Sequence, residues 1–155
     1  MENKAIIECI KDYFKQCPYL GDLAKINVDY LNVNSNDCEY WSIEQVEAPL
    51  ILGTNVLKTK THRQCQFVIA SRAFFNPLKD TQNIENLHLF EKIADWVCQN
   101  NFKGKYPELN QGEVSTSLEI TSGGYLYGTD KTNTIARYEM SCKLLYDKEE
   151  KNIWH

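Results

Sequence analysis

The stretch ARYEMSCKLLY, residues 136–146, alternates apolar and polar side chains from end to end. Successive side chains of a β-strand point to opposite faces, so this alternation predicts a strand with one buried and one solvated face. The buried set would be Ala136, Tyr138, Met140, Cys142, Leu144 and Tyr146, and the solvated set Arg137, Glu139, Ser141 and Lys143. Such a strand is typical of an antiparallel sheet that is covered on only one face.

The rest of the chain supplies partners for this strand and a cover for its apolar face. Helical spacing of apolar residues predicts helices over 3–16 and 81–100, the second with Ile84, Leu87, Phe90, Ala94, Val97 and Cys98 on its apolar side. Strands are expected over 25–33, 40–46 and 57–74, and another from residue 113, where Val114, Thr116, Leu118 and Ile120 alternate with polar residues.

The connections carry turn residues. The run NSND, residues 34–37, predicts a turn that would join the first two strands as a hairpin. Residues 47–55 contain Pro49 and Gly53 and are expected to interrupt the sheet, residues 103–112 to form a loop, and Gly123–Gly124 to form a flexible turn before the last strand.

The expected order is therefore α-β-β-β-α-β-β. This order predicts the α+β class, a two-layer arrangement of a mainly antiparallel sheet with two helices on one face. One domain is expected over residues 1–146, and the charged residues 147–155 are expected to form a mobile tail.

Composition narrows the range of functions. The chain has 155 residues, 43% of them hydrophobic, and a net charge of −4. A mildly acidic chain is poorly suited to binding nucleic acid through its phosphates, so no specific nucleic acid binding is expected. The longest apolar run, residues 48–52, is far shorter than the roughly 20 residues of a membrane helix, so no membrane partner is expected. Met1-Glu2-Asn3 lacks the basic start of a signal peptide, and none is expected.

The six cysteines, at positions 9, 17, 38, 65, 98 and 142, form no Cys-x-x-Cys pair. Their spacing argues against zinc ligation and against a disulfide framework. We interpret them as small buried apolar residues of a protein in a reducing compartment.

The sequence contains no recognisable catalytic arrangement. The three histidines, His62, His88 and His155, are each interpreted as solvated surface residues, and no nucleophile elbow, His-Glu-x-x-His motif or phosphate loop occurs. We therefore predict no catalytic, cofactor-binding or metal-binding residues and expect a protein that is not an enzyme. A small enzyme, such as an acyltransferase, remains an alternative.

Two segments predict contacts with partners. Tyr125 and Tyr127 fall in SGGYLYGTDKTN, residues 122–133, which we predict to be a loop; Tyr is enriched at interfaces, although both rings could instead pack on the ends of the sheet. Residues 47–63 hold Leu50, Ile51 and Leu52 in an unbroken apolar run, followed by Lys58, Lys60 and Arg63. Adjacent residues of a strand cannot all face one side, so part of this run should be exposed for a partner, with the basic residues pairing with an acidic neighbour. The alternative is that 48–52 closes the subunit's own core.

Four stretches carry a resemblance to a known family. They are CPYLGDLAKINVDYL (17–31), RQCQFVIASRAFF (63–75), NIENLHLFEKIADWV (83–97) and EITSGGYLYGTDKTNTIARYEMSCKLLY (119–146). With the segments between them, residues 3–146 resemble the tail terminator, or tail completion, proteins of tailed bacteriophages and phage-tail-like bacteriocins.

The resemblance implies a small α+β subunit that forms a hexameric ring on the head-proximal end of a tail tube. Such a ring stops polymerisation and docks the neck or collar, so the implied partners are further copies of the chain, tube and sheath subunits, and a neck or connector protein. The implied location is the virion or phage-tail-like particle, assembled in the host cytoplasm. If the sheet faced the channel, Glu113, Glu119 and Glu139 would line it and repel DNA phosphates. Another tail or neck structural subunit is the alternative within this class.

Overall fold

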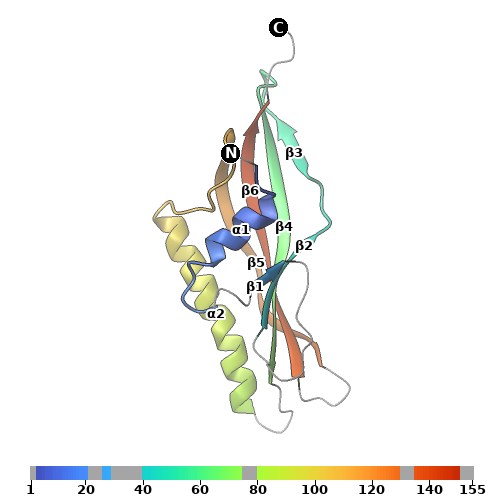
Figure 1. Cartoon of the computed structure of the whole chain (residues 1–155), viewed down its shortest axis with the longest axis vertical. Helices are drawn as coiled ribbons and strands as arrows, with labels where there is room; N and C mark the ends of the chain where they lie inside the picture. The colour runs from blue at the N-terminus through green and yellow to red at the C-terminus, as the bar shows by residue number, and fades with distance from the viewer. Residues whose placement is uncertain (1–2, 21–25, 29–39, 75–79, 130–134, 151–155) are drawn as a thin grey trace.

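A computed structural model of the chain describes residues 3–20, 26–28, 40–74, 80–129 and 135–150. Along the chain, its elements are α1 (Ile6–Phe14), β1 (Ile26–Val28), β2 (Tyr40–Val46), β3 (Ile51–Thr54), β4 (Lys60–Phe74), α2 (Asp80–Phe102), β5 (Glu113–Thr129) and β6 (Ile135–Glu149). Figure 1 shows an elongated molecule in which long, curved strands run beside α2, with α1 lying across the same side of the sheet.

The described strands form one six-stranded sheet in the order β1-β2-β4-β6-β5, with β3 also paired to β4. Strand β4 pairs with β6 along all 15 of its residues, from Lys60 opposite Glu149 to Phe74 opposite Ile135. The other edge of β4 is shared, because β2 takes positions 66–72 and β3 takes positions 61–63. The α+β class, the mainly antiparallel sheet and the order of the long elements are confirmed.

Two details of this topology differ from the expectation. Strand β3 is an additional short strand inside residues 47–55, where Pro49 and Gly53 predicted an interruption. Strands β1 and β2 are parallel, so the predicted hairpin between them is wrong. A parallel pair requires a crossover connection, which is longer than the two to five residues of a hairpin loop. The turn predicted at 34–37 lies outside the described residues.

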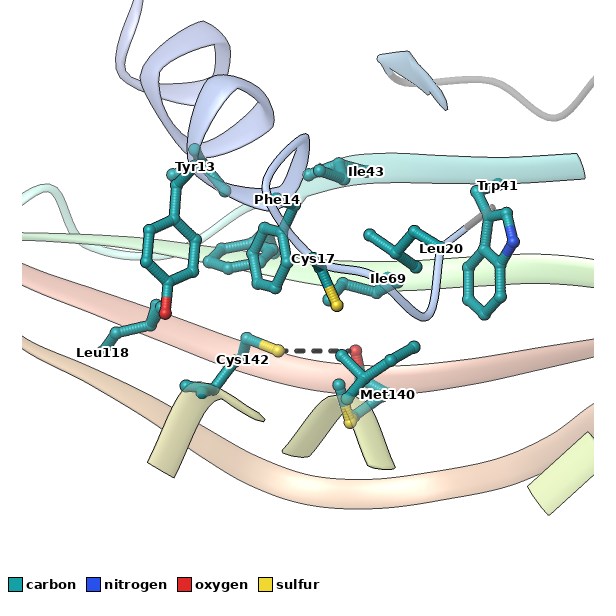
Figure 2. Packing of buried hydrophobic residues seen from close by; sticks show 14 of the residues in the cluster. Tyr13, Phe14, Cys17, Leu20, Trp41, Ile43, Ile69, Leu118, Met140 and Cys142 are labelled. Carbon is teal, nitrogen blue, oxygen red and sulfur yellow. Dashed lines mark hydrogen bonds between the residues drawn. The ribbon is translucent and has the colours of Figure 1, made fainter. Parts of the chain in front are cut away.

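The core lies between the two helices and one face of the sheet. Figure 2 shows Tyr13, Phe14, Cys17 and Leu20, from α1 and the residues after it, gathered with Ile43, Ile69, Met140 and Cys142 of the sheet. Helix α2 adds Phe90, Ile93 and Val97, and the helices touch through Tyr13 and Trp96, whose ring centroids are 4.9 Å apart. On β6 the predicted apolar set is buried as expected. Each fully buried large apolar side chain stabilises the fold by about 1.5–3 kcal/mol.

Helix α2 is rotated relative to the predicted apolar side. Ile84 and Cys98 are exposed, whereas Ile93, which the sequence pattern did not select, is fully buried. The interpretation of the cysteines as buried residues therefore fails for Cys98 and holds for Cys9, Cys17, Cys65 and Cys142, all of them free thiols. Cys38 lies outside the described residues.

Strand β5 is much longer than predicted and is irregular. It runs through Gly123, Gly124, Tyr125 and Tyr127, so the predicted flexible turn and loop in this stretch are wrong. Its pairing with β6 shifts register at several points, the first between Ser115 and Ser117. A shift of one residue moves the following side chains to the other face. Val114 is consequently 63% exposed, although it alternates with the buried Leu118 in the sequence.

The last strand extends past the domain boundary predicted at residue 146. Strand β6 continues to Glu149, so residues 147–149 belong to the sheet and not to a separate tail. Glu150 follows the strand and donates its backbone N–H to the Thr59 carbonyl at 2.8 Å.

Candidate functional site

The most exposed apolar surface of the described chain lies on the segment of residues 46–57, which we call the β3 arm. Leu50, Ile51 and Leu52 are each about half exposed, at 50%, 49% and 54%, and Val56 and Leu57 are more exposed still. None of these side chains belongs to the buried core. The β3 arm therefore presents apolar surface that the subunit's own core does not cover, and exposed apolar clusters of this kind often mark contact sites.

Hydrogen bonds hold the β3 arm in place. The buried Gln64 side chain donates to the Pro49 carbonyl at 2.7 Å, and the Gln64 backbone N–H donates to the Leu50 carbonyl at 3.0 Å. At the tip, the Asn55 side-chain oxygen accepts from the backbone N–H groups of Thr59 and Lys60 at 2.8 and 3.0 Å. An arm fixed in this way loses little conformational entropy when it binds.

The basic residues that follow the arm do not act as one group. Lys58 and Lys60 are exposed, and Lys58 has a left-handed backbone with a φ of 54°. Arg63 is different, because its guanidinium donates to the Glu150 carboxylate at 2.9 Å within the subunit. Hydrogen bonds from Thr61 and Arg63 hold the pKa of Glu150 below its usual range. Of the three predicted basic contacts, Lys58 and Lys60 remain available to a neighbour, whereas Arg63 is already paired.

Tyr125 and Tyr127 lie on β5, on the open face of the sheet opposite the helices. The Tyr125 hydroxyl donates to Glu139 at 3.0 Å, and the Tyr127 ring centroid lies 5.6 Å from the central guanidinium carbon of Arg137. Burial and the hydrogen bond to Glu139 raise the pKa of Tyr125. The Tyr127 side chain is 65% exposed, whereas Tyr125 is bound to its own sheet through its hydroxyl.

A side-chain strap across the open face explains why parts of this face are buried. Arg137 of β6 donates to Glu44 of β2 at 2.7 Å and to Glu139 at 2.8 Å, so its side chain crosses the intervening strand β4. Ala70 and Ser42, which share a row with Glu139, are fully buried without any helix above them. Burial lowers the pKa of Arg137, but the hydrogen bonds to Glu139 and Glu44 outweigh this effect and raise the pKa overall.

The three glutamates predicted to face a channel do not share one surface. Glu113 pairs with Lys148 on the helix side of the sheet, and its carboxylate accepts from the Asn110 side chain at 2.6 Å. Glu119 and Glu139 lie on the open face. There Glu139 is neutralised by Arg137 at 2.8 Å and Glu119 lies 3.3 Å from Lys143. The predicted acidic wall is therefore split, because the register shift after Ser115 turns the following residues over.

A concavity of about 1070 Å³ lies between α1, the end of α2 and residues 104–115. Two of its titratable groups are engaged within the subunit. The Asp12 carboxylate accepts from Lys4 at 2.7 Å, which lowers the pKa of Asp12. Tyr13 accepts a hydrogen bond from Asn100 at 3.1 Å, and burial raises the pKa of Tyr13 to about 12. These groups stabilise the packing of α1 against α2.

The sequence predicted the β3 arm within residues 47–63 but missed the strap. Val56 and Leu57 lie in the predicted segment without being singled out as contacts, although their apolar character beside Asn55 was a usable signal. Glu44 had no such signal, since its partner Arg137 is 93 positions away in the chain.

In the described part of the chain, no three His, Cys, Asp or Glu side chains gather in a way that could hold a metal ion. Neither α1 nor α2, the helices of the described residues, is long and apolar enough to cross a bilayer.

Comparison with models of protein families finds no match for this chain, and comparison with curated protein sequences finds none.

Proposed function

We propose that this chain is a ring subunit that caps the head-proximal end of a phage or phage-like tail tube. In this role it is not an enzyme. It binds further copies of itself, in a ring of six, together with tube and sheath subunits and a neck or connector protein. It stops polymerisation of the tube and offers the collar a docking surface, within a virion or a bacteriocin particle assembled in the host cytoplasm.

The exposed β3 arm is the observation that carries this proposal. A subunit that works only within an assembly must keep apolar surface outside its own core, and the arm does so with Leu50, Ile51 and Leu52. Covering the exposed half of each of these side chains contributes about 1 kcal/mol, and a ring repeats that contribution at every contact. The resemblance over residues 3–146 and the α+β fold that it implies support the same role.

Deletion of the gene in the producing strain, followed by electron microscopy of the particles, tests the proposal. We expect tails of uncontrolled length or tails that fail to join a neck. Tails of normal length with a defect at the baseplate end would contradict it and would favour another structural subunit.

A triple variant, Leu50→Ser, Ile51→Ser and Leu52→Ser, connects this function to the arm. Because the three side chains lie outside the core, the purified variant should melt near the wild-type temperature and yet fail to restore capping. The control is Ile84→Ser, which removes an apolar side chain that is 63% exposed on α2 and should restore capping. A large loss of thermal stability in the triple variant would instead assign the arm to the subunit's own core.

A further inference from the structure

Four strands, β3, β4, β6 and β5, lie side by side at one end of the sheet (Figure 1). One row of pairing across them consists of Ile51, Arg63, Tyr146 and Ser115, and a second consists of Thr54, Thr61, Lys148 and Glu113. Strand β3 and the start of β5 are therefore the two edges of the same part of the sheet, at the same level along its length.

The directions of these strands suit a head-to-tail contact. Each neighbouring pair in the row is antiparallel, so β3 and β5 run in opposite directions. If β3 of one copy were placed beside β5 of the next, the new pair would also be antiparallel. The alternation of strand directions would continue without a break from one copy to the next.

Both edges are open within the described ranges, where no strand pairs with the outer side of β3 or of β5. An edge strand presents unpaired N–H and C=O groups that can add a further strand. The opening on β5 lies between Glu113, whose backbone N–H donates to the Asn110 carbonyl at 3.0 Å, and Leu118, whose carbonyl accepts from Asn101 of α2 at 2.7 Å. Exposed apolar side chains flank both openings, with Leu52 on one and Val114 on the other.

The charges on the two edges are largely complementary. The exposed Lys58 and Lys60 follow β3, whereas the exposed Glu108 and the half-buried Glu113 lie at the start of β5. Glu47 is a negative charge near the basic residues of β3, and Lys105 is a positive charge near the acidic residues of β5. Each of them is one charge against two of the other sign. Complementary charges of this kind orient a contact and fix its register.

We propose that copies of this chain join head to tail by strand addition, with β3 of one copy pairing antiparallel with residues 114–117 of the next. Main-chain hydrogen bonds supply affinity in such a contact, and the side chains beside them supply specificity. The proposal deepens the ring function and rests on it for closure, because a head-to-tail contact forms a ring only when its rotation closes.

Cross-linking between two engineered cysteines tests this pairing. The background variant carries Cys38→Ser and Cys98→Ser, which leaves only the buried thiols. Into it go Leu52→Cys and Val114→Cys, both at exposed positions where folding should be unaffected, as a thermal melt will check. A short bis-maleimide should then convert the purified protein, and the protein in tails from producing cells, into a ladder of covalent dimers, trimers and larger species.

The controls separate strand addition from other contacts. Leu52→Cys with Ile84→Cys has the same number of exposed thiols, and 84 and 114 are equally exposed, yet this pair should give no ladder. Dimers from either single-cysteine variant would indicate a two-fold contact and would overturn the proposal. The absence of a ladder both in solution and in tails would also overturn it.

The results also test the strand pairing separately from the proposed capping function. Capped tails of normal length that carry the double variant but give no ladder would refute strand addition and leave the capping function standing. A ladder in the purified protein, combined with normal tails in the deletion strain, would support the pairing and refute the capping function.

Discussion

Gly124 is the position where a single added methyl group should do the most damage. It lies inside β5, and a Cβ atom built on it would lie 2.9 Å from Cδ2 of Phe90 and closer still to Cβ and Cγ of the same residue. Phe90 is 1% exposed and belongs to α2. Its Cβ is fixed by the helix backbone, so rotating the ring cannot relieve the clash and α2 would have to move away from the sheet.

The expected cost follows from this geometry. Forcing extra atoms into a packed core usually destabilises a protein by about 1–3 kcal/mol, and a clash with a helix-bound Cβ belongs at the upper end. A loss of roughly 3 kcal/mol lowers the melting temperature of a domain of this size by about 6–12 °C. Gly124→Ala should therefore remain folded at room temperature but melt clearly earlier.

The neighbouring glycine supplies a matched control. A Cβ on Gly123 would meet nothing within 4 Å, and its backbone is outside the left-handed region. Gly123→Ala should be neutral or more stable by about 0.4–1 kcal/mol, because alanine reduces the entropy of the unfolded chain. Thermal and urea unfolding followed by circular dichroism compare the two variants. Equal stability of Gly124→Ala and Gly123→Ala would refute the close approach of α2 to β5.

Three further predictions concern single side chains. Replacing Arg137 by Met should destabilise the protein by about 3 kcal/mol in urea unfolding, because it leaves the buried Glu139 carboxylate without its cationic partner and with only the hydrogen bond from Tyr125. Lys143→Met, which removes a more exposed pair, should cost less than about 1 kcal/mol. Burial raises the pKa of Tyr13 to about 12, so the unfolded phenol ionises first and stability should fall as the pH rises from about 10 to about 12; Tyr13→Phe should weaken this decline in melts across that range. Maleimide labelling of the native protein should modify Cys98 within the described chain, and unfolding should be needed to label Cys9, Cys17, Cys65 and Cys142.

The sequence predicted the elements whose burial follows a regular period. Strand β6 shows its alternation because helices cover one of its faces and solvent the other, and Phe90 and Val97 of α2 show helical spacing for the same reason. The fold class depended on these two signals, and both are local to one element.

The rest depended on contacts between distant parts of the chain. Gly123–Gly124 resembles a turn in the sequence, and only the approach of Phe90 explains a glycine within a strand. The register shift after Ser115 has no local signature, yet it exposes Val114 and separates Glu113 from Glu119. Strand β3 is stabilised by the edge of β4 and by Gln64, so its own residues show no alternation.

The pairing of β4 with β6 also has a consequence for how the chain folds. Every one of its pairs joins positions that are far apart in the chain, from Phe74 with Ile135 to Lys60 with Glu149. Contacts at such separations close slowly, because the entropy of a long loop is lost before any pair forms. During synthesis the ladder between β4 and β6 cannot form until β6 has left the ribosome. Until then β4, the strand with which β3 pairs, lacks its neighbour on the other side. A nascent chain should therefore reach its assembly-competent shape only after β6 has been synthesised, which delays contact between copies until the sheet of each subunit is complete.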